Sequence, residues 1–254
     1  MTQPPLIWSE AYPVRAYDVD ARGQLGIASV CNFLQDAAGC HAHALGLSVE
    51  QLHTWHLTWV LVCMRLEVAR HLAWRDCLHI ETWPSHQDRL FSQRDFILYD
   101  DAETIVGRCV TVWVLMDLQR WRPRRLSDLP NPLPIPERPR ALSRIPDKIA
   151  AVDVGKSDTQ IPFRVGDRDL DRNGHVNNVR YIEWAIETVP VNILNTCRLE
   201  ILEINFTGEA FYNESIIAES ISREAAQPCF HHTVRSQTTG THLARAQTHW
   251  RMMT

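Results

Sequence analysis

A short polar stretch in the second half of the chain gathers side chains able to do acid–base chemistry. Residues 169–178 read DLDRNGHVNN, and Asp171, Asn173 and His175 alternate within them. Their side chains can therefore project to one side of an extended or looping backbone, and Gly174 permits a tight turn. A carboxylate, an amide and an imidazole held together can accept a proton, orient a water molecule and donate a hydrogen bond.

The residues that follow predict an amphipathic helix. Apolar side chains recur at helical spacing from Val176 to Val189, so we expect the helix to begin at about Val176. The backbone N–H groups of Val176 and Asn177 are then candidates for holding an anion or a developing oxyanion. The competing interpretation is a helix-capping turn with a structural histidine, because Asp and Asn cap helices well.

The composition excludes several classes of protein. The chain has 254 residues, of which 45% are hydrophobic and 22% charged, as in an ordinary folded protein of one or two domains. It has no apolar run of membrane-spanning length and no N-terminal signal pattern, so we expect a cytoplasmic protein without membrane association. The net charge of −4 gives no indication of nucleic-acid binding, and seven cysteines without a Cys-x-x-Cys pair indicate reduced thiols.

Several other histidines do not indicate a catalytic metal centre. His41 and His43, the pair His231 and His232, and His249 lack the accompanying cysteine or acidic pattern of a known metal site. We therefore expect no metal and no cofactor.

The chain repeats one pattern twice. Residues 14–25 parallel residues 163–176, with Asp20 matching Asp171 and Gly23 matching Gly174. A helical segment follows each copy, and then come segments rich in β-branched and aromatic residues. These lie at about 57–68, 77–86, 90–99 and 105–117, and at 199–208, 214–222, 229–237 and 242–252. The pattern predicts an α+β fold of two tandem hotdog domains, each a curved antiparallel sheet wrapped around a central helix.

A segment rich in proline separates the copies. It predicts an extended connector at 127–158 between domains at 1–126 and 159–254. The first copy has Arg22 and Gln24 where the second has Asn173 and His175, so we expect it to be non-catalytic. Its tryptophans suit either an apolar slot for a chain-like ligand or ordinary core packing: Trp55, Trp59, Trp83 and Trp113.

Arginines gather where the first copy ends. One interpretation is a solvated linker, and the other is a docking surface for an acidic partner or a phosphate. The cluster comprises Arg120, Arg122, Arg124 and Arg125, followed by Arg138, Arg140 and Arg144.

The polar stretch resembles a motif of the acyl-acyl-carrier-protein thioesterases, whose plant members carry Asp-Leu-Asp-x-Asn-x-His-Val-Asn-Asn-x-x-Tyr. Here the motif runs from Asp169 to Tyr181. The similarity covers about residues 9 to 252 and includes TWVL at 58–61 and DLQRWRPRRLS at 117–127. It implies tandem hotdog domains that hydrolyse fatty acyl-acyl carrier protein and release free fatty acid in fatty acid biosynthesis.

The resemblance also implies a catalytic set of Asp171, Asn173, His175 and Glu209, the last from the segment LEINFTGEA at 202–210. Plant members have a cysteine at the next position, where this chain has Ala210, so water is the expected attacking group. Cys197 and Cys229 lie outside the motif. Either Glu209 or Asp171 can serve as the base that accepts the proton of water.

The implied partner is acyl carrier protein, which would dock on Arg120, Arg122, Arg124 and Arg125. The tandem would be a monomer or a homodimer. Two alternatives stay open at this point: an acyl-CoA thioesterase, which a comparison of the two carriers separates, and a non-catalytic protein that binds acyl thioesters, which would release no thiol.

Overall fold

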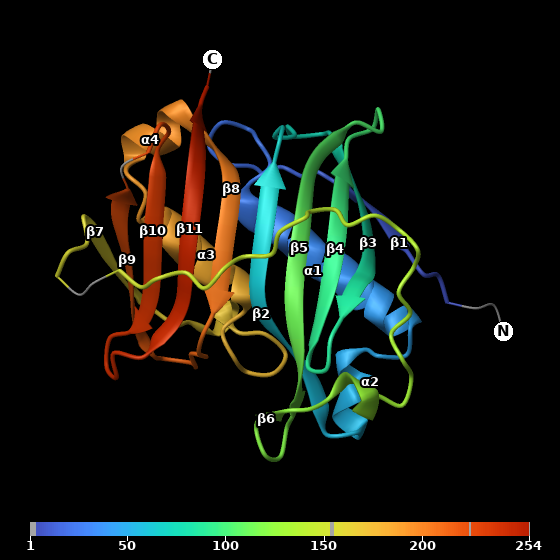
Figure 1. The fold of residues 1–254 in the computed structure, drawn as a ribbon. Coiled ribbons are helices and arrows are strands. Elements are labelled where there is room, and N and C mark those ends of the chain that lie inside the picture. Colours follow the sequence, from blue (N-terminus) through green and yellow to red (C-terminus); the bar gives the residue numbers. More distant parts are fainter. Residues whose placement is uncertain (1–3, 153–154, 224, 254) are drawn as a thin grey trace. The chain divides into compact units, whose positions relative to one another are not determined.

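The computed structural model describes residues 4–152, 155–223 and 225–253, which form two compact units (Figure 1). The first unit comprises Met1–Val62 and Val68–Ile145, and the second comprises Cys63–Glu67 and Pro146–Thr254. Each unit combines one longer helix with an antiparallel sheet, as the repeated pattern predicts.

The first unit orders its strands β1-β3-β4-β5-β2. Helix α1 (Ile27–Ala44) packs against β1 and β3 through a buried face that includes Val30, Leu34 and Ala37. The strands are β1 (Trp8–Pro13), β2 (Leu57–Val68), β3 (Cys77–Gln87), β4 (Phe91–Tyr99) and β5 (Ile105–Asp117). The short elements are α2 (Val49–Thr54), β6 (Arg122–Pro123), which pairs with the end of β5, and a 3₁₀ turn at Leu126–Asp128.

The second unit orders its strands β8-β11-β10-β9-β7, and residues 63–67 of β2 pair with β8. Helix α3 (Asn178–Glu187) buries Val179, Ile182 and Ala185 against this sheet. The strands are β7 (Thr159–Arg164), β8 (Cys197–Phe206), β9 (Ser215–Arg223), β10 (Cys229–Ser236) and β11 (His242–Met252), with α4 (Val191–Thr196) and a 3₁₀ turn at Asp167–Asp169.

The hotdog fold expected from the sequence is confirmed, with two differences of detail. Each sheet carries an additional edge strand before its helix, β1 and β7. Helix α3 begins at Asn178 rather than at Val176, because Asn177 is its N-cap and its side chain accepts a hydrogen bond from the N–H of Val179 at 3.0 Å. Val176 instead forms a β-bridge with Leu170. None of the described helices is long and apolar enough to cross a membrane.

The proline-rich connector is largely exposed but is attached to the protein at several buried residues. Between residues 129 and 152 the backbone forms no helix or strand, yet Leu142, Ile149 and Val152 are buried. Arg140 donates to both carboxylate oxygens of the fully buried Asp95, at 2.9 and 3.2 Å.

Arg138 is held in the same way. Its guanidinium donates to Glu81 at 2.5 Å and lies over the ring of Trp83, 4.2 Å from the centroid. Arg138 and Arg140 thus differ from a freely solvated linker, because they form ion pairs with Glu81 of β3 and Asp95 of β4.

Candidate active site

Asp171 holds the polar loop together. Its Oδ1 accepts hydrogen bonds from the backbone N–H groups of Asn173 at 2.8 Å and His175 at 3.2 Å. Its Oδ2 accepts from the side-chain amide of Asn173 at 3.3 Å. Gly174 has φ of 78°, a left-handed conformation that glycine adopts without strain, so the chain can turn back and present His175.

The loop brings His175 against Glu209. The Nδ1 of His175 lies 3.3 Å from Oε1 of Glu209, and the two side chains are 27% and 31% exposed. His175 forms a β-bridge with Phe211, and its ring meets that of Phe211 edge-on at 5.1 Å. The segment between β8 and β9 thus brings Glu209 to a partly exposed imidazole, where solvent can reach both groups.

The protein environment raises the pKa of Glu209. Burial is the largest cause, and the negative charge of Asp171 also raises the pKa, while the charge of His175 and its hydrogen bond act in the opposite direction. A carboxylate whose pKa is raised is a better proton acceptor than an ordinary one when it is ionised.

Tyr181 is a positioning residue that sequence reasoning did not assign. The buried Tyr181 hydroxyl accepts a hydrogen bond from the N–H of Ala210 at 3.0 Å. The motif contains this tyrosine, but only the fold shows that it reaches the residue next to Glu209. Helix α3 and the β8–β9 segment are therefore joined directly beside Glu209.

We expect Tyr181→Phe to destabilise the protein and to lower kcat together. The change leaves the buried N–H of Ala210 without its acceptor, which costs ~1–3 kcal/mol in the free energy of unfolding. Urea denaturation and steady-state kinetics measure the two effects. The control is Tyr12→Phe, which removes an exposed hydrogen bond to Asp36 and should cost less. A Tyr181→Phe protein with unchanged stability and kcat would show that the contact is unimportant.

The expectation that Val176 and Asn177 offer free N–H groups to an oxyanion is wrong. Val176 donates its N–H to the carbonyl of Ala210 at 3.0 Å, and Asn177 donates to the carbonyl of Asp169 at 2.8 Å. Both groups already serve to attach the loop to its neighbours, so the stabilisation of an oxyanion requires other donors.

The first unit contains a second copy of the loop. Asp20 Oδ1 accepts from the N–H groups of Arg22 at 2.9 Å and Gln24 at 3.1 Å, and Gly23 has φ of 72°. The hydrogen bond from Leu25 N–H to the Leu72 carbonyl, at 2.8 Å, corresponds to that from Val176 to Ala210. The sequence alignment of the two copies is therefore matched by their hydrogen bonds.

This correspondence separates the features that both loops share from those that only the second loop has. An aspartate with the same backbone contacts occurs in both loops, so Asp171 is explained by loop geometry alone. Leu72 corresponds to Ala210, so the preceding residue, His71, corresponds to Glu209. Gln24 corresponds to His175. At these matched positions only the second unit has an imidazole beside a carboxylate, so Glu209 is a stronger candidate for a base than Asp171.

The arginines near the end of the first unit differ in their partners. Arg124 forms ion pairs with Asp117 at 3.1 Å and Asp128 at 2.9 Å, so its charge is used within the protein. Arg120, Arg122 and Arg125 are exposed on and beside the hairpin formed by β5 and β6.

The fold and the site define a tandem hotdog protein with an Asp-x-Asn-x-His loop in its second unit. The model of the acyl-ACP thioesterase N-terminal domain matches residues 5–130, and that of the C-terminal domain matches residues 153–252. The chain belongs to the acyl-ACP thioesterase family, as the sequence resemblance predicts.

Curated relatives agree with this assignment, and solved structures agree with the fold. The oleoyl-acyl carrier protein thioesterase of Coriandrum sativum is 29% identical over 231 residues, and the alignment covers 85% of this chain but 63% of that protein. A thioesterase of the same description from Arabidopsis thaliana is 28% identical, with 96% and 76% covered. The fold matches an acyl-ACP thioesterase from Bacteroides thetaiotaomicron, with a TM-score of 0.87, 22% identity and 99% and 100% covered. It also matches a 12:0-ACP thioesterase from Umbellularia californica, with a TM-score of 0.85, 22% identity and 98% of each chain covered.

Proposed function

We propose that the chain hydrolyses the thioester of fatty acyl-acyl carrier protein and releases free fatty acid. The observation that carries the proposal is the contact of 3.3 Å between His175 and Glu209. The matched positions of the first unit are Gln24 and His71, which supply no carboxylate. Family membership supports the choice of substrate. The protein would act in the cytoplasm as a monomer or homodimer of the tandem, and the first unit would bind the acyl chain.

In this proposal Glu209 is the general base. One carboxylate oxygen faces His175, and the other accepts a proton from the water that attacks the thioester carbonyl. His175 donates a hydrogen bond to the thioester and protonates the departing thiolate. Asn173 orients the water or the carbonyl through its amide, and Asp171 holds the loop that carries both side chains.

The cysteines support water as the nucleophile. Ala210, next to Glu209, has no reactive atom and is fully buried. Cys197 is fully buried and Cys229 is 3% exposed, and the nucleophilic form of a cysteine is the thiolate.

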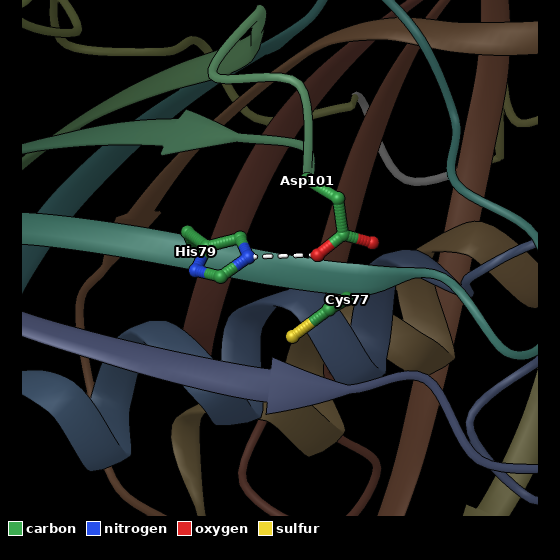
Figure 2. A group of neighbouring side chains, drawn as sticks. All are labelled: Cys77, His79 and Asp101. Atoms are coloured by element: carbon green, nitrogen blue, oxygen red, sulfur yellow. Dashed lines mark hydrogen bonds and ion pairs between the residues drawn. The ribbon is translucent and has the colours of Figure 1, made fainter.

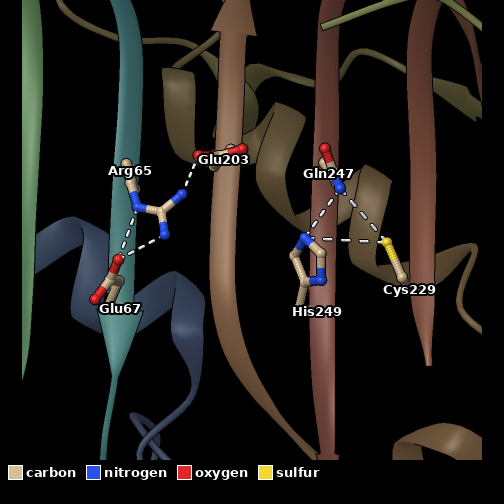
Figure 3. A network of polar contacts seen from close by, with 6 residues as sticks. All are labelled: Arg65, Glu67, Glu203, Cys229, Gln247 and His249. Atoms are coloured by element: carbon tan, nitrogen blue, oxygen red, sulfur yellow. Dashed lines mark hydrogen bonds and ion pairs between the residues drawn. The ribbon is translucent and has the colours of Figure 1, made fainter. Parts of the chain in front are cut away.

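Cys229 and His249 lie side by side, as the residues of a Cys–His catalytic pair do (Figure 3). The Nε2 of His249 is 4.0 Å from the sulfur, but the same nitrogen is 2.9 Å from the amide of Gln247. Burial raises the pKa of the Cys229 thiol. Strand alternation places Cys229 on the opposite face of β10 from His232, which contacts Thr188 at the end of α3. The thiol is therefore protonated and faces away from the helix that follows the polar loop.

We expect the acid limb of the kcat/KM profile to lie above the usual range of a glutamate carboxyl group. Glu209 acts only when ionised, so activity is full above its raised pKa and falls as the pH drops through that value. Asp171→Asn removes a charge that raises this pKa and should shift the limb to lower pH. The control, Asp20→Asn in the matching loop, should leave the limb in place. If the acid limb stayed at the same pH in Asp171→Asn, the assignment of Glu209 as the base would be contradicted.

We expect Arg122→Glu combined with Arg125→Glu to raise KM for acyl-acyl carrier protein. Exposed charges act mainly on the encounter with an acidic partner, and salt screens them over a Debye length of ~10 Å at 0.1 M. A short acyl-pantetheine thioester should be hydrolysed as before. The control is Arg223→Glu, a reversal at an exposed arginine of the second unit. If hydrolysis of both substrates were impaired equally, the arginines would have a structural role. If neither were impaired, acyl carrier protein would dock at another surface.

A comparison of carriers tests the proposed function. The purified chain is given one acyl group on acyl carrier protein and on coenzyme A, and released thiol is followed with a chromogenic reagent. The proposal predicts a higher kcat/KM with acyl carrier protein. A preference for coenzyme A would favour the alternative acyl-CoA thioesterase, and no release from either would favour a binding protein.

A further inference from the structure

The first unit contains three side chains with the chemistry of transition-metal ligands. Cys77 and His79 lie at the start of β3, and Asp101 lies in the turn between β4 and β5 (Figure 2). One donor atom of each, the sulfur, an imidazole nitrogen and a carboxylate oxygen, lies within 4.8 Å of the other two. His79 Nε2 and Asp101 Oδ1 are already 3.0 Å apart.

Strand geometry explains why these residues meet. Cys77 and His79 are two positions apart on one strand, so their side chains lie on the same face. His79 pairs with Tyr99 across β3 and β4, which brings the turn after Tyr99 beside it. Asp100 fixes that turn by accepting from the N–H groups of Ala102 at 2.9 Å and Thr104 at 2.8 Å. Asp101 is thereby held next to His79.

An open, acidic cavity of about 560 Å³ adjoins the cluster. Its described lining residues include five carboxylates and no lysine or arginine: Glu10, Glu81, Asp100, Asp101 and Glu103. Two of these carboxylates form ion pairs with arginines, Glu81 with Arg138 and Asp100 with Arg70. The other three, Glu10, Asp101 and Glu103, add negative charge to the cavity. A concave surface of one sign raises the local concentration of cations.

We propose that Cys77, His79 and Asp101 bind a divalent transition-metal ion of the zinc class. A thiolate, an imidazole and a carboxylate form a donor set that suits Zn²⁺, whereas Mg²⁺ and Ca²⁺ prefer oxygen alone. With bonds of ~2.0–2.3 Å, a tetrahedral ion separates its donors by roughly 3.3–3.8 Å. Side-chain rotations that move the donor atoms by about 1 Å bring them from within 4.8 Å to this spacing. A water molecule would occupy the fourth position. Binding releases the thiol proton to solvent.

The ion would tie β3 to the β4–β5 turn and so stabilise the first unit, because a ligand that binds only the folded state shifts the unfolding equilibrium. The cluster shares no residue with the hydrolytic site of the second unit. The inference therefore stands or fails independently of the proposed function.

Cobalt titration of the metal-free, full-length protein tests the site. Bound Co²⁺ should produce a near-ultraviolet band of thiolate-to-cobalt charge transfer that saturates at a single equivalent. Cys77→Ser should abolish the band, and His79→Gln should weaken binding at least tenfold. The matched control is Cys40→Ser, because Cys40 and Cys77 are the half-buried cysteines of the chain and the other five are buried. This control should keep the band.

Thermal unfolding with Zn²⁺ gives a second readout. The ion should raise Tm of the wild-type protein and of Cys40→Ser, but not of His79→Gln or Asp101→Asn. The side chains changed in the last two variants are 43% and 67% exposed, so both proteins should fold. No thiolate band in the wild-type protein, a band that survives Cys77→Ser, or a Tm that Zn²⁺ leaves unchanged would each overturn the proposal.

Discussion

Glu209→Gln should lower kcat by ~10²–10⁴-fold, the usual contribution of a general base. Glutamine keeps the size of the side chain and can still accept a hydrogen bond from His175 through its carbonyl oxygen. It cannot take a proton from water. Because Glu209 is 31% exposed, the change should leave the fold intact, which circular dichroism can check. KM should change much less than kcat, since the interaction lost is needed mainly in the transition state.

The matched control for this variant is His71→Gln. His71 has the position in the first unit that Glu209 has in the second, next to the residue whose carbonyl accepts from the loop. Turnover should be retained in His71→Gln because the first loop has Gln24 where the second has His175. If Glu209→Gln turned over at a near-normal rate, Glu209 would not be the base, and Asp171 would return as the candidate.

His175→Ala should also reduce kcat by ~10²–10⁴-fold. The change removes the imidazole that lies 3.3 Å from Glu209 and that would protonate the leaving thiolate. It also removes a positive charge and a hydrogen bond that lower the pKa of Glu209, so any residual activity should have its acid limb at higher pH than in the wild-type protein. Kinetics with an acyl-pantetheine thioester measure this loss without the carrier-docking step.

Gln24→Ala is the control for His175, because Gln24 has the same position in the first loop and its N–H donates to Asp20 in the same way. This backbone contact survives truncation of the side chain, so the variant should keep its kcat. A large loss in Gln24→Ala, or a small one in His175→Ala, would mean that the two loops had been assigned the wrong roles.

Much of the fold could be predicted from the sequence because the strands are long and their apolar residues are regular. Strands β2 and β5 begin and end where the pattern predicts, at Leu57–Val68 and Ile105–Asp117. The six-residue edge strands β1 and β7 were missed. Each contains a proline, Pro13 or Pro162, a residue that generally argues against a strand but is tolerated at an edge.

The site was predictable only in part, for a physical reason. Asp171, Asn173 and His175 are close in sequence, so their spacing indicates a common loop. Glu209 came from the family resemblance, because nothing local in the sequence links it to His175. The N–H groups of Val176 and Asn177 donate to the carbonyls of Ala210 and Asp169, and the residue spacing alone does not indicate these partners. The expectation that both groups are free for an oxyanion was therefore wrong.

The time course of thiol release from fatty acyl-acyl carrier proteins of several chain lengths, followed from the first turnover, tests the central claim most directly. If Glu209 activates water for direct attack, release should be linear from the start, free fatty acid should form in equal amount, and the quenched protein should carry no acyl group. The claim would be contradicted by the absence of release. It would also be contradicted by a burst equal to the enzyme concentration together with an acylated peptide, since that result would identify a covalent intermediate on the protein.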